Sequence, residues 1–132
     1  MASIFTRIIN GEIPCYKVAE DDHYMAFLDV RPLKPGHTLV VPKQEVDYIF
    51  DLDEETLAGM MLFAQKVARA MKEVIDCKRI GVAVIGLEVP HAHMHLVPLT
   101  RESDLLFTNP RAAVSPEENE RLAREIGEHV IL

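Results

Sequence analysis

The 132-residue chain has no tryptophan and only two cysteines, Cys15 and Cys77. Two isolated cysteines provide neither a disulfide scaffold nor a four-cysteine metal knuckle, so we expect both to be buried thiols. No apolar run approaches the roughly 20 residues that cross a bilayer. The N-terminal stretch lacks the basic start and apolar block of a signal peptide. These absences predict a cytoplasmic protein with no membrane partner.

Basic residues are also scarce relative to acidic ones. Lysine and arginine number 14 against 21 aspartates and glutamates, which gives a net charge of −7. Such a chain has no overall field that attracts DNA or RNA, so a nucleic acid polymer is not an expected partner. An anionic ligand would have to be held by local groups. Linkers and repeats are absent as well, and the length fits one domain spanning residues 1–132.

Histidines, in contrast, are concentrated in one place. Half of the six lie within five residues, in the stretch Pro90-His91-Ala92-His93-Met94-His95-Leu96-Val97-Pro98. Alternate residues of a β-strand share a face, which would set neighbouring imidazoles roughly 6.5–7 Å apart. Residues two apart do not meet on a helix, and the flanking prolines leave little room for one. We therefore predict a strand with three imidazoles on one face.

Such a row of imidazoles has several chemical uses. An imidazole can attack phosphorus or carbonyl centres, move protons near neutral pH, or bind a metal. Clustered groups of this kind usually mark a functional site rather than a solvated strand face. Three imidazoles can hold zinc with an open position, and that alternative stays open. No carboxylate, however, stands at general-base spacing beside them.

The rest of the chain predicts an α+β domain with about five antiparallel strands. Apolar residues at helical spacing indicate a short N-terminal helix capped by Ser3 and one long helix. A proline at the first helical position and a Ser-x-x-Glu box begin a C-terminal helix, which we expect to end at Gly127. Residues 101–113 are predicted as loop. The expected strands are 17–20, 24–29, 37–41, 79–85 and 90–98, and the expected helices are 3–9, 54–76 and 115–126.

His91-Ala92-His93-Met94-His95-Leu96-Val97 matches the His-φ-His-φ-His-φ-φ signature of the histidine triad (HIT) family, where φ is apolar. The stretch IFTRIINGEIPCYKVAEDDHYMAFLDVRPLKPGHTLVVPK also resembles the N-terminal half of that family. The resemblance covers roughly residues 3–101 and leaves residues 102–132 unmatched. It implies a HIT-like fold and a homodimer, for which the long helix and the strand at 79–85 are the expected contact surface.

The same resemblance implies an enzyme that hydrolyses or transfers nucleotides without a metal or other cofactor. Members cleave at the α-phosphate of nucleoside phosphoramidates or dinucleoside polyphosphates through a nucleotidyl-histidine intermediate. By this resemblance His93 is the nucleophile and His91 orients it, while His95 and His37 line the phosphate site. Asp29 matches the carboxylate that binds the ribose. Residues matching those that enclose the base of a purine nucleotide are Ile4, Phe5, Ile8, Phe27, Leu28 and Val30.

The sequence also departs from the family pattern. Many members hold a structural zinc with two cysteines and a histidine, at positions that here resemble Ser3, Thr6 and Glu45, which predicts that this chain has no such zinc. Leu87 replaces a glutamine that helps to hold the phosphate or the leaving group, and Glu88 could repel an anionic leaving group. An intact site behind a tightened hairpin is equally compatible with these changes. The alternative function is a nucleotide-binding regulatory protein with little or no turnover.

Overall fold

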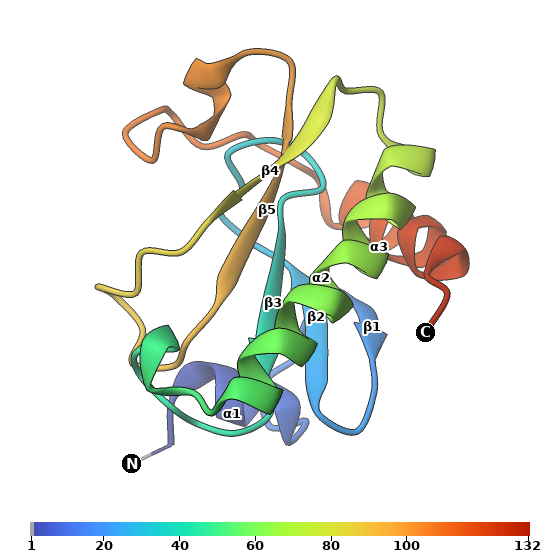
Figure 1. The fold of residues 1–132 in the computed structure, drawn as a ribbon. Helices are drawn as coiled ribbons and strands as arrows, with labels where there is room; N and C mark the ends of the chain where they lie inside the picture. The colour runs from blue at the N-terminus through green and yellow to red at the C-terminus, as the bar shows by residue number, and fades with distance from the viewer. Residues whose placement is uncertain (1) are drawn as a thin grey trace.

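The computed structural model describes residues 2–132 as a five-stranded antiparallel sheet with helices on both faces (Figure 1). The strand order is β1-β2-β3-β5-β4, and every neighbouring pair is antiparallel. The α+β prediction is therefore confirmed. The strands are β1 (Lys17–Glu20), β2 (Tyr24–Leu28), β3 (Thr38–Pro42), β4 (Arg79–Ala83) and β5 (Met94–Leu99). The helices are α1 (Ile4–Ile9), α2 (Glu54–Val74) and α3 (Pro116–His129), with short 3-10 turns η1 (Ile49–Asp51) and η2 (Glu102–Leu105).

Side-chain caps fix where the three helices begin. Ser3 accepts a hydrogen bond from the Thr6 backbone N–H at the start of α1, as its position predicts. Asp53 begins α2 in the same way, and Ser115 begins α3 with a proline at the first turn. Each cap satisfies an N–H that the helix itself cannot pair.

The sheet separates two apolar cores, because alternate side chains of each strand point to opposite faces. Ala26 of β2 and Met94 of β5 pack with α2 and α3, which Figure 1 shows lying together against one face of the sheet. Phe27 and Leu39 point the other way and pack against Phe5 of α1. The histidine face of β5 is therefore the face that carries α1.

The strand predicted over residues 90–98 begins only at Met94, so His91 and His93 precede it. The neighbouring strands explain this later start. Val40 of β3 is the partner of Met94, and the last residue of β4 is the partner of His95. Upstream of these pairs, the Ala92 N–H bonds to the Val46 carbonyl, in a loop, at 2.7 Å. The chain at 91–93 is therefore held by loop contacts rather than by a strand ladder.

The C-terminal helix continues through Gly127 to His129, so the predicted stop at Gly127 is wrong. Gly127 does not adopt the positive φ of a helix-ending glycine. Its role is packing, because a Cβ at this position would lie 2.7 Å from the backbone carbonyl oxygen of Val18 in β1. The glycine lets α3 approach β1 closely.

Three smaller findings complete the fold. Residues 102–105, predicted as loop, form the 3-10 turn η2. Cys15 and Cys77 are free thiols and only partly buried. Among residues 2–132, no helix combines the length and apolar character needed to span a membrane.

Candidate active site

Four imidazoles and two phenyl rings form a continuous cluster on the α1 face of the sheet. The Phe5 ring centroid lies 4.9 Å from that of His93, and His93 lies 5.0 Å from His95. His95 lies 5.2 Å from His37, which directly precedes β3, and 4.7 Å from Phe107. The structure thus brings His37 to the triad from 56 residues earlier in the chain than His93, as the resemblance implies.

The protonation pattern of His93 follows from its single hydrogen bond. Its Nδ1 lies 2.8 Å from the backbone carbonyl oxygen of His91, which can only accept. Nδ1 therefore carries the proton of the neutral ring, and Nε2 keeps a free lone pair. An imidazole with a free Nε2 is a nucleophile.

His91 is fully buried and has both ring nitrogens engaged. Nε2–H donates to the Pro42 carbonyl oxygen at 2.8 Å, and Nδ1 accepts from the Ser3 hydroxyl at 2.8 Å. The ring is thus held in one orientation, which fixes the carbonyl that holds His93. With no free lone pair on His91, the three histidines of the triad do not form a common metal site.

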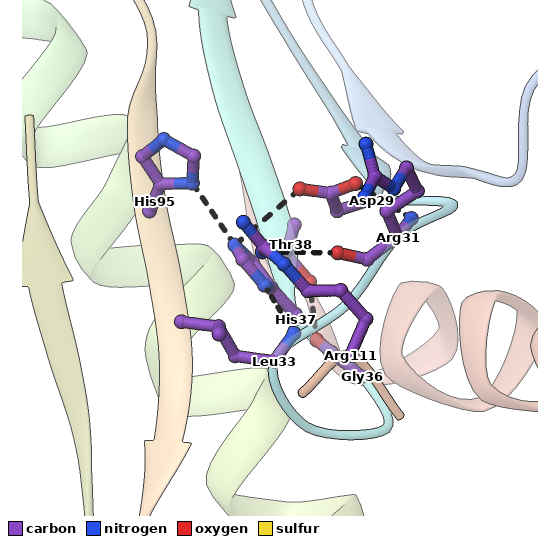
Figure 2. Close-up of polar contacts among 8 residues, drawn as sticks. All are labelled: Asp29, Arg31, Leu33, Gly36, His37, Thr38, His95 and Arg111. Atoms are coloured by element: carbon purple, nitrogen blue, oxygen red, sulfur yellow. Dashed lines mark hydrogen bonds and ion pairs between the residues drawn. The ribbon is translucent and has the colours of Figure 1, made fainter. Parts of the chain in front are cut away.

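His37 and His95 form a second hydrogen-bonded chain, which Figure 2 shows. The backbone N–H of Leu33 donates to His37 Nδ1 at 3.0 Å, so the proton of the ring is on Nε2. His37 Nε2 lies 3.0 Å from His95 Nδ1, which must accept. The proton of His95 is therefore on Nε2, where it can be donated to a bound oxygen.

Burial keeps both of these rings neutral at ordinary pH. Desolvation, and to a smaller extent the positive charge of Arg111, lowers the pKa of His37 to about 4. Desolvation, followed by repulsion from His37, lowers the pKa of His95 to about 3. His95 can therefore bind a phosphate as a hydrogen-bond donor but not as a cation, while the single N–H of neutral His37 is used by His95.

Asp29 lies beside the His37–His95 chain at the end of β2. Its Oδ2 is 3.7 Å from His37 Nε2, and its Oδ1 accepts the backbone N–H of Arg31 at 2.8 Å. Metal ligation needs several His, Cys, Asp or Glu side chains close together. Within residues 2–132, Asp29, His37 and His95 are the one set of three such residues whose possible ligand atoms all lie within 4.8 Å of one another. The His37 nitrogen that faces this group carries a proton, so these residues do not suit a metal ion.

The site opens into a cavity of about 420 Å³. Asp29, His93 and His95 lie in its wall. A larger apolar cavity of about 710 Å³ lies between α2 and β4 and shares His93. His93 therefore lies between two cavities. The further residues that line the smaller cavity are Arg31, Leu39, Ile85, Gly86, Leu87, Glu88, Val89, Phe107 and Arg111.

The family model of the HIT domain matches residues 10–102, which is most of the chain. The chain belongs to the histidine triad family. Adenosine 5′-monophosphoramidase of Schizosaccharomyces pombe is 33% identical over 132 residues, covering 98% of this chain and 99% of the yeast protein.

Solved HIT structures agree with the fold. A HIT-like protein involved in cell-cycle regulation from Bartonella henselae superposes with a TM-score of 0.84 at 33% identity, covering 96% of this chain and 95% of that one. A zinc-bound histidine triad family protein from Mycobacterium smegmatis gives a TM-score of 0.83 at 33% identity, covering 97% and 94%. The HIT-like fold predicted from the sequence is confirmed.

The residues matched to a HIT nucleobase site lie in three different environments. Phe5 and Phe27 are buried, with ring centroids 5.6 Å apart, and Phe5 contacts the ring of His93. Ile4 and Val30 are exposed, and Ile8 is half-buried beside Phe5. The Leu28 side chain belongs to the core under α2 and α3. The structure therefore gathers Phe5, Phe27 and Ile8 on the α1 side and does not bring the Leu28 side chain to the histidine face.

The positions matched to a HIT zinc site form a hydrogen-bonded cluster. Glu45 accepts from the Thr6 hydroxyl and from the Ser3 backbone N–H, both at 2.6 Å. These bonds hold the pKa of Glu45 well below its usual range. Hydroxyl groups are not the ligands that zinc prefers, so these residues do not fit the metal. The cluster instead connects α1 to His91 through Ser3.

Phe107 and Arg111 are site residues that the sequence reasoning missed. They lie in the segment after β5, where the resemblance ends and no periodicity predicts an element. An aromatic residue and an arginine closely following a histidine-rich strand are a weak signal. Only the folded chain places Phe107 against His95 and sets the Arg111 guanidinium 5.5 Å from the Phe107 ring.

Proposed function

We propose that this protein is a nucleotide hydrolase or transferase that cleaves at the α-phosphate of a nucleoside phosphoramidate or a dinucleoside polyphosphate. The observation that carries the proposal is the hydrogen bond from His93 Nδ1 to the His91 carbonyl, which leaves Nε2 as a nucleophile in the wall of a cavity. Similarity to a yeast adenosine 5′-monophosphoramidase along nearly the whole chain supports the same substrate class.

In the first step, the lone pair of His93 Nε2 attacks the α-phosphorus. An N–P bond forms as the bond to the leaving group breaks, and the leaving group departs with that electron pair and a proton from solvent. The neutral His95 donates its Nε2–H to a non-bridging phosphate oxygen. The His93 ring becomes positively charged in this step, and the His91 carbonyl stabilises that charge through Nδ1–H.

In the second step, water attacks the phosphorus of the nucleotidyl-histidine. The N–P bond breaks, the electron pair returns to His93 Nε2, and the water gives up a proton to solvent as nucleoside monophosphate forms. No metal enters either step. The histidine divides one difficult displacement into two easier ones.

The remaining assignments concern substrate binding. Asp29 lies in the cavity wall with one carboxylate oxygen free of backbone contacts, and a carboxylate can accept from two vicinal ribose hydroxyls. For a purine base we propose the apolar side chains of Ile4, Phe5 and Ile8, of which Phe5 contacts the ring of His93 and Ile8 packs beside Phe5. This arrangement supports a purine nucleotide as substrate.

One observation favours the alternative of a nucleotide-binding regulator with little turnover. Leu87 stands where the family resemblance implies a glutamine, and it is 89% exposed at the cavity. It offers no hydrogen bond to a leaving group, and Glu88 beside it adds negative charge. These residues would slow the release of an anionic leaving group.

The deciding experiment incubates the protein with adenosine 5′-monophosphoramidate, with and without a chelator. We expect turnover that survives the chelator and a trapped adenylyl adduct on His93, identified by mass spectrometry. His93→Ala should abolish both, whereas His23→Ala, at an exposed histidine, should change neither. Nucleotide binding without turnover would favour the regulator, and loss of activity with the chelator would favour a metal enzyme.

We also propose a homodimer that forms through β4 and α2. β4 is an edge strand with unpaired backbone groups, and apolar side chains beside it are exposed. Val82, Ile85 and Met61 are each about half exposed, at 47%, 49% and 54%. They line the larger cavity, which a second copy would cover. The cytoplasmic location stays a prediction from the sequence.

A further inference from the structure

The chain after β5 folds back over the histidine site and is fixed there at several points. The backbone N–H of Ala112 donates to the Pro32 carbonyl at 2.8 Å. Lys34 pairs with Asp104 at 3.1 Å, and Asp104 also accepts the backbone N–H of Thr100 at 2.8 Å. The loop at 31–36, which precedes His37, therefore holds the segment that carries Phe107 and Arg111.

Arg111 is held with its guanidinium close to the buried histidines. Its Nη1 donates to the Arg31 carbonyl at 3.2 Å, and its Cζ lies 5.5 Å from the Phe107 ring centroid. Phe107 in turn packs against His95. Figure 2 shows the Arg111 side chain extending across the region of His37 and Asp29. The guanidinium has five N–H donors, and only one is used by this contact.

An anionic phosphate in this cavity needs a positively charged side chain beside it. A bound phosphate is anionic, yet His37 and His95 are neutral, and Asp29 and Glu88 add negative charge. Arg31 and Arg111 are the two cationic side chains in the cavity wall. Of these, Arg111 is the one whose guanidinium is fixed by a carbonyl and an aromatic ring. A planar guanidinium is well suited to two oxygens of one phosphate.

We propose that Arg111 is the cationic ligand of the substrate's phosphate group, donating to its non-bridging oxygens while His93 Nε2 faces the phosphorus. The inference rests on the proposed nucleotide site and adds a residue from the segment that follows the triad strand. It makes Arg111 a determinant of phosphate recognition beside the hydrogen bond from the neutral His95.

The test compares binding of AMP with binding of adenosine, which has the same base and ribose but no phosphate. Calorimetric titrations would use the wild type, Arg111→Gln, Arg111→Lys and the control Arg124→Gln, at an exposed residue of α3. We expect Arg111→Gln to weaken AMP binding by about tenfold or more, because a hydrogen bond to a charged group is lost. Adenosine binding should change less than twofold, Arg111→Lys should recover part of the AMP affinity, and the control should match the wild type.

Equal losses of AMP and adenosine affinity in Arg111→Gln would overturn the inference, since they indicate a structural role. Unchanged AMP binding in that variant, or no AMP binding by the wild type, would overturn it as well. Turnover of adenosine 5′-monophosphoramidate, measured in parallel, separates the two proposals. A protein that binds AMP through Arg111 but has no turnover supports the phosphate ligand and refutes the hydrolase.

Discussion

At the scale of single residues, four chemically identical imidazoles differ because of the backbone groups beside them. The carbonyl of His91 puts the proton of His93 on Nδ1, and the N–H of Leu33 puts that of His37 on Nε2. His93 thus keeps a free lone pair on Nε2, and His37 becomes a donor to His95. Each role depends on which ring nitrogen a neighbouring backbone group engages, a property that the spacing of histidines does not encode.

Because His37 and His95 are neutral in the folded protein, the free energy of unfolding depends on pH. The folded pKa values, about 4 and about 3, lie below the ordinary value of 6.5. Below pH 6.5 the unfolded chain therefore takes up protons that the folded chain does not, so stability falls as pH falls. For His37, the loss between pH 6.5 and 4 amounts to roughly 3 kcal/mol as an upper figure. Urea denaturation at pH 7, 6 and 5 measures this loss of stability.

A pair of variants tests whether His37 causes this fall in stability at low pH. His37→Gln should flatten the dependence between pH 7 and 5, while His23→Gln, at an exposed histidine, should leave it unchanged. Stability that rises or stays level over this range in the wild type would contradict the assigned neutral states.

At the scale of elements, glycine positions decide how closely the helices approach the sheet. Gly127 of α3 faces the Val18 carbonyl of β1, and Gly59 of α2 faces the Tyr24 ring of β2. A Cβ at Gly59 would lie 2.2 Å from the Tyr24 hydroxyl, whose proton is donated to the Thr56 carbonyl. Both glycines lie inside helices, where propensity alone would favour alanine.

Gly127→Ala tests the packing of α3. Alanine is favoured over glycine in a helix by roughly 0.5–1 kcal/mol, so a free helix would gain stability. Here the new methyl group meets a backbone oxygen that cannot move independently of β1, and overpacking typically costs about 1–3 kcal/mol. We expect a net loss of stability in chemical denaturation, whereas Glu128→Ala, at the next and exposed position, should be nearly neutral. A more stable Gly127→Ala protein would show that α3 can shift on β1.

At the scale of the whole molecule, the sheet has one edge that is covered and one that is not. α3 packs against β1 at one end of the strand order. β4, at the other end, has exposed apolar side chains beside it and an apolar cavity under them. An uncovered apolar edge of this kind favours pairing with another strand.

Val82→Lys should therefore disrupt the proposed homodimer. A charged side chain in the middle of β4 would be buried against its partner, so we expect light scattering after gel filtration to report a shift from dimer to monomer. Ile131→Lys, at a residue that is 85% exposed near the C-terminus, should leave the mass unchanged. A wild-type monomer would exclude this assembly.

Local sequence signals predicted most of the fold. Helix starts at Ser3 and Ser115 depend on caps that act within three residues, and short runs on either side of a turn predicted β1 and, to within one residue, β2. The errors occurred where a distant segment decides the outcome. β5 starts late because β4 ends opposite His95 and the chain before Met94 bonds to the loop at Val46, and α3 continues through Gly127, which packs against β1.

The sequence by itself determined the segregation of side chains, the cluster of three histidines and the family, because these are properties of short spacings and ordered motifs. Tertiary structure alone decided how the rings of His91 and His95 are held, since the groups that decide it, the Pro42 carbonyl, the Ser3 hydroxyl and the His37 ring, come from distant segments. It also decided that Arg111 reaches the site, because no local pattern connects that loop to residues 80 positions earlier.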